Sequence, residues 1–341
     1  MNILLTGAAG FIGSAFTRLA LKNGNKVIAL DKLTYAGHLE NLNNISDKNF
    51  IFQKGCITDE HLVSQLLSKH EIDYVVNMAA ESHVDNSISS PKEFIDTNII
   101  GTYNLLNCSL QYYKTLSETK KLNFRYLQIS TDEVFGTLGE EGKFNEDYPY
   151  QPNSPYSASK ASGDHLVRAW FHTYKLPTII TNCSNNYGPR QFPEKLIPTV
   201  IMRALQLKSI PVYGNGYNIR DWIYVEDHCA GVYLALTKGT PGESYCFGGH
   251  NEISNIEVVK KICTYLDTAR PLEGKKSYHE LIEFVTDRLG HDWRYAIDDS
   301  KAQKELNYKR QFSSFDDGLA STIQWYFKNQ EWIINVLKTK E

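Results

Sequence analysis

Short apolar runs alternate with longer segments in which apolar residues recur every three or four positions. A short run between turn residues is typical of a buried strand, and the longer spacing is typical of a helix packed on one face. The pattern predicts strands at 2–6, 27–30, 50–54, 74–78 and 125–129, and helices at 14–23, 60–69, 91–113 and 154–175. Strands that alternate with helices in this order predict a doubly wound, parallel α/β sheet.

The second half of the chain has a different pattern. Residues 213–216, with the sequence Tyr-Gly-Asn-Gly, predict a tight hairpin turn. Helical spacing returns at 255–267 and 300–306, and an amphipathic, aromatic-rich helical pattern runs from 315 to 337. We expect a larger domain formed by 1–184 and about 221–250, interleaved with a smaller α/β domain formed by about 185–220 and 251–341.

Composition excludes several classes of protein. The chain has 341 residues and a formal net charge of −3, so it lacks the basic excess of a nucleic-acid-binding protein. Its six cysteines are scattered, without the paired spacing of a zinc site, and we expect a reduced, cytoplasmic protein with no metal. No apolar run approaches the length of a membrane span, and no signal peptide is recognisable at the start, so we expect no membrane association.

A glycine-rich turn, with glycines at 7, 10 and 13, joins the first predicted strand to the first helix. Glycines let the backbone approach a pyrophosphate, and the helix that follows offers unpaired N–H groups and the positive end of its dipole. Asp31 ends the second strand, where a carboxylate can accept hydrogen bonds from an adenosine ribose. The sequence therefore predicts a Rossmann-like, dinucleotide-binding sheet. Asp31 would repel a 2′-phosphate, so NAD is favoured over NADP.

Tyr156 and Lys160 lie four residues apart in a predicted helix and so share a face. An ammonium group near a phenol favours the phenolate, which would make the tyrosine usable as a base near neutral pH. Alone, such a pair is also common on ordinary helix surfaces, so its meaning depends on the rest of the chain.

Several other short sequence motifs, taken together, are characteristic of one protein family. They are DKLTYAG at 31–37, AESHVD at 80–85, STDEVFG at 130–136, NCSNNYGPR at 182–190, FPEKLIP at 192–198, NIRDW at 218–222 and DRLGHD at 287–292. With the glycine turn and the Tyr156/Lys160 pair, they resemble the nucleoside-diphosphate-sugar 4,6-dehydratases, a branch of the extended short-chain dehydrogenase/reductases. The resemblance covers nearly the whole chain.

This resemblance implies a dehydration of a hexose linked to a nucleoside diphosphate, with NAD as cofactor. Hydride leaves C4 for NAD, water is lost across C5 and C6, and the hydride returns to C6. Oxidation at C4 is needed because it makes the C5 proton acidic. The implied roles are a base for the 4-hydroxyl at Tyr156, a base for the C5 proton at Glu133 and an acid for the C6 hydroxyl at Asp132. Lys160 would lower the tyrosine pKa and hold the nicotinamide ribose, and Thr131 would hydrogen-bond the C4 oxygen.

The acidic pair Asp132 and Glu133 separates a dehydratase from an epimerase, because an epimerase needs neither a C5 base nor a C6 acid. Adjacent residues of an extended strand point to opposite faces. Both carboxyl groups can therefore meet one sugar only if the strand ends at or before Thr131, which we predict.

The remaining expected contacts follow from the same resemblance. The cofactor contacts are Gly7, Gly10, Phe11, Ile12, Gly13, Asp31, Lys32, Thr34, Ala79, Ala80, Tyr156 and Lys160. The substrate contacts are Ser82, His83, Asn185, Lys195, Leu196, Arg220, Arg288 and His291, with no chemical role given to His83. The three cations would neutralise the diphosphate.

The expected substrate is glucose linked to thymidine diphosphate. Uridine, cytidine or guanosine diphosphate sugars stay open as alternatives, as do 4-epimerisation, decarboxylation and a cofactor-sensing role without catalysis. Three residues depart from the family pattern: Cys56 replaces an aspartate that would meet the adenine, and Leu289 and Trp293 replace a proline and an arginine near the nucleotide. Thr58 or Asp59 could substitute for the missing acid. Relatives imply a homodimer formed through helices 91–113 and 154–175.

Overall fold

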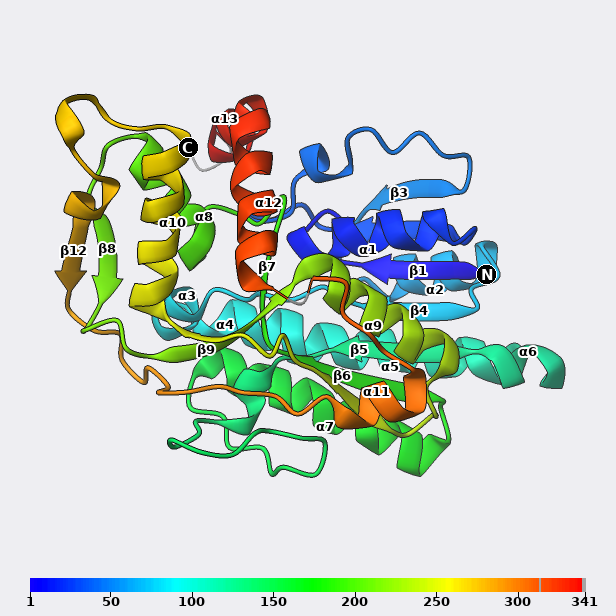
Figure 1. The fold of residues 1–341 in the computed structure, drawn as a ribbon. Helices are drawn as coiled ribbons and strands as arrows, with labels where there is room; N and C mark the ends of the chain where they lie inside the picture. Colours follow the sequence, from blue (N-terminus) through cyan, green and yellow to red (C-terminus); the bar gives the residue numbers. More distant parts are fainter. Residues whose placement is uncertain (313, 339–341) are drawn as a thin grey trace.

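The computed structural model describes residues 1–312 and 314–338. Its centre is a seven-stranded sheet in which all neighbouring strands are parallel, in the order β3-β2-β1-β4-β5-β6-β10 (Figure 1). These strands are β1 (Asn2–Thr6), β2 (Lys26–Asp31), β3 (Phe50–Lys54), β4 (Tyr74–Asn77), β5 (Arg125–Ile129), β6 (Thr178–Cys183) and β10 (Ser244–Phe247). The order changes direction between β1 and β4, as in Rossmann sheets, and it confirms the predicted doubly wound fold.

Helices cover both faces of this sheet (Figure 1). They are α1 (Phe11–Lys22), α2 (Glu60–Lys69), α5 (Thr102–Thr115), α7 (Pro155–Tyr174), α9 (Val225–Lys238) and α11 (Ser300–Leu306). Side chains of a strand alternate between the two faces. Leu4 of β1 accordingly packs in one apolar layer with α2, α5 and α7, whereas its neighbours Ile3 and Leu5 pack in the other with α1, α9 and α11. Burial on both faces explains why the strands read as unbroken apolar runs.

The smaller part of the molecule contains four helices and two small sheets. The helices are α8 (Leu196–Leu205), α10 (Asn255–Ala269), α12 (Phe315–Lys328) and α13 (Gln330–Lys338). A three-stranded sheet has the order β11-β9-β7 and a two-stranded sheet pairs β12 with β8. Their strands are β7 (Asn185–Tyr187), β8 (Ile210–Tyr213), β9 (Ile219–Tyr224), β11 (Glu252–Ser254) and β12 (Ile282–Val285).

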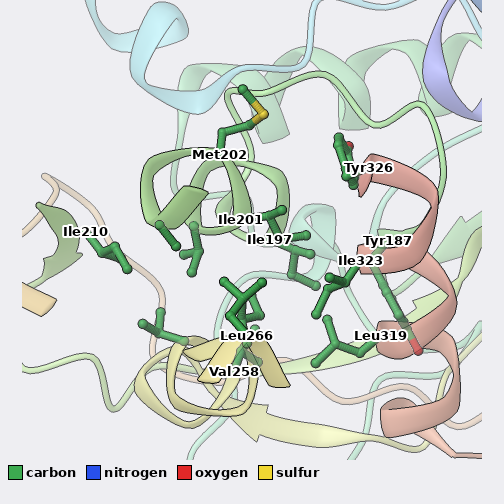
Figure 2. Close-up of a cluster of buried hydrophobic side chains, with 14 of the residues drawn as sticks. Tyr187, Ile197, Ile201, Met202, Ile210, Val258, Leu266, Leu319, Ile323 and Tyr326 are labelled. Carbon is green, nitrogen blue, oxygen red and sulfur yellow. The ribbon is translucent and has the colours of Figure 1, made fainter. Parts of the chain in front are cut away.

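One apolar cluster holds this smaller part together. Figure 2 shows Ile197 and Ile201 of α8 directed toward Leu266 of α10, with Leu319 and Ile323 of α12 closing the cluster. The aromatic tail thus packs on the smaller part, as its amphipathic pattern predicted.

Two long helical predictions are wrong in detail because the helices change geometry along their length. The predicted helix 91–113 comprises α4 (Pro91–Phe94), the π-helical segment η2 (Ile95–Gly101) and α5. The predicted helix 315–337 is two helices, because Asn329 has φ −120° and ψ 45° and interrupts the helical backbone. Apolar spacing is nearly the same across such interruptions, so it does not reveal them.

The hairpin predicted around residues 213–216 is also wrong. Gly214 and Gly216 have positive φ angles of 55° and 75°, as in a turn. The strands on either side of the turn belong to different sheets, since β8 pairs with β12 and β9 with β7 and β11. Turn chemistry fixes a change of direction but not the partner of each strand.

The remaining elements are short. They are the helices α3 (Val84–Ser89) and α6 (Glu118–Asn123) and the 3₁₀ segments η1 (Leu39–Leu42), η3 (Asp132–Phe135), η4 (Glu273–Lys275) and η5 (Tyr278–Leu281). None of the helices within 1–312 and 314–338 combines the length and apolar character needed to cross a membrane.

The cluster in Figure 2 yields a stability prediction. Ile323 is 0% exposed in that cluster, whereas Ile334 of α13 is 53% exposed. We expect Ile323→Ala to lower the free energy of unfolding by about 2–5 kcal/mol, because it leaves a cavity, and the control Ile334→Ala to change it by less than about 0.5 kcal/mol. Denaturant titration followed by tryptophan fluorescence measures both. Equal losses in the two variants would contradict this account of the core.

Candidate active site

A cavity of about 640 Å³ opens at the carboxyl ends of the parallel strands. Residues at or just after the ends of β1, β2, β4, β5 and β6 line one side, and residues of α8, β8, β9 and the 288–295 segment line the other. Ligands of open α/β sheets bind in the crevice outside these strand ends. The cavity therefore lies where the fold is expected to bind its ligands.

All the residues predicted to contact cofactor or substrate, or to take part in catalysis, line this cavity. They are Gly7, Gly10, Phe11, Ile12, Gly13, Asp31, Lys32, Thr34, Ala79, Ala80, Ser82, His83, Thr131, Asp132, Glu133, Tyr156, Lys160, Asn185, Lys195, Leu196, Arg220, Arg288 and His291. The structure brings these positions together, and their individual roles stay predictions.

The glycine turn packs too closely for any side chain at two of its positions. Gly7 has φ +66°, and a Cβ atom there would lie 2.7 Å from the Met78 carbonyl oxygen. A Cβ atom on Gly13 would lie 2.1 Å from the Gly7 carbonyl oxygen. The first turn of α1 therefore sits directly against the loop, with its backbone N–H groups beside the cavity.

Asp31 fixes the shape of this loop from the next strand. Its Oδ2 accepts a hydrogen bond from the Ala9 backbone N–H at 2.8 Å, and its Oδ1 accepts one from the Leu33 N–H at 2.8 Å. Burial raises the pKa of Asp31, and these two N–H groups lower it. A tight glycine cradle with a carboxylate at its rim fits the pyrophosphate and ribose of a dinucleotide.

Cys56 also lines the cavity, and its Sγ lies 3.0 Å from the Thr58 hydroxyl. Asp59, one candidate substitute for the missing acid, caps α2 instead, since its Oδ1 accepts from the Leu62 N–H at 2.9 Å. Neither Thr58 nor Asp59 is among the residues that line the cavity. Of these three residues, Cys56 alone lines the cavity.

The chain leaves the sheet just before the acidic pair. β5 ends at Ile129 and the 3₁₀ turn η3 begins at Asp132, which confirms the prediction that the strand ends at or before Thr131. Thr131 caps this turn, because its Oγ1 accepts from the Glu133 N–H at 3.3 Å and donates to Asp132 Oδ1 at 3.3 Å. The turn explains how two adjacent carboxyl groups line the same cavity.

The two carboxyl groups have unequal surroundings. Asp132 is 2% exposed, and burial together with the neighbouring Glu133 and Asp221 raises its pKa well above the usual range. Its Oδ2 has no hydrogen-bond partner within the described residues. Burial also raises the pKa of Glu133, but Lys195, Arg220 and Arg288 lower it. Such a difference favours a protonated Asp132 beside an ionised Glu133.

Tyr156 and Lys160 share one face of α7 near its start. A capping box between Ser154 and Ser157 and a proline at the first helical position fix that start. Lys160 is 5% exposed and donates from Nζ to the Ile129 carbonyl oxygen at 2.6 Å.

The pKa of Tyr156 is raised overall in the protein alone, and the lowering expected from Lys160 stays a prediction. Burial raises the pKa of this phenol well above 10, and the charge of Glu133 raises it further. The ammonium is directed at a backbone carbonyl, and the sequence spacing could not reveal that competing acceptor.

The predicted cations converge around Glu133. Lys195 Nζ donates to the Ser82 carbonyl oxygen at 2.7 Å, and the Arg220 guanidinium donates to the Asp292 carbonyl oxygen at 2.9 Å while lying 4.4 Å from the ring centre of Tyr295. Arg288 forms an ion pair of 2.6 Å with Asp85. Each cation is thus held by protein groups at the cavity wall.

The two histidines differ in their partners. His83 Nδ1 accepts from the Asn86 N–H at 3.4 Å at the start of α3, and burial with nearby Lys195 lowers its pKa to about 4. It is therefore neutral at pH 7. His291 Nδ1 lies 2.7 Å from Asp287 Oδ1, although burial lowers the pKa of this imidazole.

Several cavity residues were missed by the sequence analysis. They include Tyr35, Glu81, Asp85, Cys183, Glu194, Trp222, Asp292 and Tyr295. Most lie in runs that carried the family resemblance, so their position in these runs was the available signal. Leu289 and Trp293 are 77% and 45% exposed and are not among the cavity-lining residues.

Comparison with known proteins agrees with the geometry of the site. The family described as GDP-mannose 4,6 dehydratase matches residues 4–322. This chain belongs to that nucleotide-sugar 4,6-dehydratase family. It is 53% identical over 335 residues to the dTDP-glucose 4,6-dehydratase of Xanthomonas campestris pv. campestris, covering 98% of this chain and 95% of the relative.

Two solved structures of this dehydratase family are closely similar. One is dTDP-glucose 4,6-dehydratase from Bacillus anthracis in complex with NAD, with a TM-score of 0.86, 44% identity and coverage of 98% of this chain and 99% of that chain. The other, from Streptomyces venezuelae with NAD bound, has a TM-score of 0.89, 41% identity and coverage of 98% and 100%. The whole described fold is therefore that of NAD-containing dehydratases.

The close packing at Gly13 yields a binding prediction. A methyl group in Gly13→Ala must displace the Gly7 carbonyl, so we expect NAD to bind at least roughly tenfold more weakly, a loss of about 1.4 kcal/mol. Gly139→Ala is the matched control, because a Cβ atom there meets no atom within 4 Å. Isothermal titration with NAD measures both variants. Unchanged binding by Gly13→Ala would contradict the proposed cradle.

Proposed function

We propose that this chain is an NAD-dependent lyase that removes water from dTDP-glucose to give dTDP-4-keto-6-deoxyglucose. Its similarity to dTDP-glucose 4,6-dehydratases over nearly its whole length supports this activity. The observation that carries the proposal is the pair Asp132 and Glu133, which line one cavity in unequal surroundings. Oxidation at C4 requires neither carboxyl group, whereas elimination across C5 and C6 requires a base and an acid.

The first step is the removal of the 4-hydroxyl proton by the phenolate of Tyr156. The pKa of this phenol is high in the protein alone, and the positive charges of Lys160 and of a bound oxidised nicotinamide would lower it. NAD supplies the hydride acceptor for C4 and later the hydride donor for C6, and the residues that would hold it are the glycine turn, Asp31 and Lys160. The Lys160 ammonium uses one N–H bond on the Ile129 carbonyl and keeps two for the nicotinamide ribose. Thr131, which lines the cavity beside the acidic pair, would hydrogen-bond the C4 oxygen.

The elimination follows from the charge states of the acidic pair. Ionised Glu133 takes the C5 proton, which the adjacent C4 carbonyl has made acidic. Protonated Asp132 gives its proton to the C6 hydroxyl, which leaves as water while a double bond forms between C5 and C6. When the hydride returns to C6, Glu133 delivers its proton back to C5 and is ionised again. Tyr156 then still holds the 4-hydroxyl proton and Asp132 lacks one, so the loss of one proton from Tyr156 to solvent and the gain of one by Asp132 restore the starting state. Preorganised groups of this kind contribute roughly 10²–10⁴-fold each.

The diphosphate is proposed to bind at Lys195, Arg220 and Arg288, whose positive charges lie near Glu133. Asn185 and His291 would add polar contacts, with Ser82, His83 and Leu196 alongside. The interleaved division into 1–184 with about 221–250, and about 185–220 with 251–341, is proposed as the separation between a cofactor domain and a substrate domain, with α11 as a part of the second range that packs on the larger sheet.

The choice of nucleoside and the cellular setting complete the proposal. UDP- or CDP-glucose is the alternative substrate, and 4-epimerisation is the less favoured activity because it leaves Asp132 and Glu133 without a role.

The cellular setting is proposed from two observations. All six cysteines are free thiols, which supports a reducing, cytoplasmic location. The proposed 4-keto-6-deoxy product supports a place in deoxysugar synthesis, such as the supply of rhamnose precursors.

A homodimer through α5, α7 and the preceding segment η2 is also proposed. Ile95, Ile100 and Tyr103 are 46–49% exposed on η2 and α5. Tyr103 meets Trp170 of α7 edge-on at 5.9 Å, so the apolar surface continues onto the second helix. Two copies of this helix pair would bury it in a four-helix bundle.

The substrate proposal is tested by incubating the protein with dTDP-, UDP- and CDP-glucose in separate reactions. The alkaline absorbance of a 4-keto product is followed, with and without added NAD. We expect product from dTDP-glucose at the highest kcat/KM. Product from none of the three sinks the proposed function, and faster turnover of UDP- or CDP-glucose replaces the proposed nucleoside.

The acidic pair is tested with Asp132→Asn and Glu133→Gln, which keep shape but remove acid and base function. We expect each to lower kcat by roughly 10²–10⁴-fold while bound substrate still reduces NAD, because oxidation at C4 precedes elimination. Absorbance of the reduced cofactor in a single turnover separates the two steps. If both variants keep wild-type kcat, the roles are wrong.

The dimer is tested by light scattering after size-exclusion chromatography. Ile100→Glu buries a charge in the proposed interface, so we expect a monomer at concentrations where the wild type is a dimer. Leu122→Glu on α6, where Leu122 is 75% exposed, is the control and should leave the mass unchanged. A dimer that survives Ile100→Glu would exclude this interface.

A further inference from the structure

Asp164 is a buried acid that the proposed reaction does not use. It lies in α7 four residues after Lys160, and it is 0% exposed. Its Oδ2 accepts hydrogen bonds from the Ser130 hydroxyl at 2.5 Å and from the Tyr150 hydroxyl at 3.1 Å. Ser130 stands between Ile129, which accepts from Lys160, and the catalytic residue Thr131. Asp164 therefore joins the helix that bears Tyr156 and Lys160 to the strand end that bears the acidic pair.

The Lys160 ammonium needs a compensating charge. It is 5% exposed, and its hydrogen bond to the Ile129 carbonyl satisfies a donor without neutralising the charge. Burial lowers the pKa of Lys160, and the two groups that raise it are Asp164 and Cys183. Burial also raises the pKa of the Cys183 thiol far above neutral pH, so this thiol carries no charge. This leaves Asp164 as the ionised group whose negative charge compensates the buried charge of Lys160.

The other titratable groups around Asp164 are neutral. Tyr150 precedes α7 and Tyr126 lies in β5, and burial raises the pKa of both phenols. Burial raises the pKa of Asp164 itself to about 6, with Lys160, Ser130 and Tyr150 acting in the opposite sense, so the carboxyl group is ionised at pH 7. Its Oδ1 is buried without a hydrogen-bond partner among the described residues. Among the described residues, no protein donor therefore shares the negative charge on this second oxygen.

A short network extends from Asp164 to the catalytic turn. Asn182 of β6 donates from Nδ2 to the Tyr150 hydroxyl at 3.4 Å and to the Thr131 carbonyl oxygen at 3.1 Å. Thr131 in turn caps η3, which carries both catalytic carboxyl groups. The same carboxylate thus contacts the strand end directly through Ser130 and indirectly through Tyr150 and Asn182.

We propose that Asp164 is a positioning residue of the reaction: its buried carboxylate keeps Lys160 charged and holds the Ser130–Thr131 strand end against α7. It touches neither substrate nor cofactor and acts through Lys160, which donates to the Ile129 carbonyl and to the ribose. This inference rests on the proposed function for the role of Lys160, but the charge pairing itself is a property of the protein alone.

The first test is a pH profile of C4 oxidation. Asp164→Asn keeps the shape of the side chain but removes its charge, so the pKa of Lys160 falls and the ammonium is lost at lower pH. We expect the alkaline limb of single-turnover NAD reduction by dTDP-glucose to move down by roughly 1–3 pH units. The measurement is made in a Glu133→Gln background, where blocked elimination prevents the return of hydride from the reduced cofactor to C6.

Tyr150→Phe is the control for that profile. It removes a hydrogen bond to the same Oδ2 but leaves the negative charge, so we expect the limb to stay at its original pH even if the rate falls. An equal displacement of the limb in both variants, or no displacement in Asp164→Asn, overturns the proposal.

The second test is a double-mutant cycle on thermal stability, which requires neither cofactor nor substrate. Asp164→Asn should lower the melting temperature markedly when Lys160 is present and much less in a Lys160→Met background, where no buried ammonium needs compensation. If Asp164→Asn alone does not fold, the Asp164→Asn/Lys160→Met protein should recover folding. Equal losses in both backgrounds, or no recovery, overturn the charge pairing.

The two tests separate the failure of this inference from that of the proposed function. If the stability cycle shows coupling but no nucleotide sugar is turned over, the proposed function is rejected and the charge compensation of Lys160 by Asp164 stands. If dTDP-glucose is turned over but the stability cycle shows no coupling between Asp164 and Lys160, the proposed role of Asp164 is rejected and the proposed function stands.

Discussion

The exit of the chain from the sheet after Ile129 is the constraint on which the proposed site depends. The Ile129 carbonyl accepts from Lys160, Ser130 contacts Asp164, and Thr131 caps the turn that carries Asp132 and Glu133. An extended backbone would direct the two carboxyl groups to opposite faces of the sheet. Because the strand stops here, one short segment contacts the helix of Tyr156 and presents two carboxyl groups, the proposed acid and base, to the same cavity.

Unequal surroundings then divide the work between two similar side chains. Asp132 is enclosed, and the nearest charges that raise its pKa are carboxyl groups, Glu133 and Asp221. Glu133 faces the cations that are proposed to bind the diphosphate, and these oppose the rise in its pKa that burial causes. The same cations can therefore serve both substrate binding and the ionised state of the base, which couples the two functions through electrostatics.

Much of this arrangement was predictable from the sequence, because parallel strands buried on both faces leave unbroken apolar runs and ligand-binding residues follow the ends of those strands. The predicted strand 125–129 and helix 60–69 match the structure residue for residue. Strand pairing was not predictable locally, so the predicted hairpin at 213–216 was wrong. The role of Asp164 was hidden for another reason: an acid in a helix normally faces solvent, and only the tertiary structure buries it beside Lys160. Spacing revealed the shared face of Tyr156 and Lys160 but not the Ile129 carbonyl, which accepts a hydrogen bond from the ammonium.

The central claim is that Asp132 is protonated while Glu133 is ionised near neutral pH. Infrared difference spectroscopy of wild type against Asp132→Asn and against Glu133→Gln at pH 7 measures it directly. The account predicts that Asp132→Asn removes the C=O stretch of a protonated carboxyl group and that Glu133→Gln removes carboxylate bands. A carboxylate signal lost on substitution of Asp132 would contradict the assignment of acid and base.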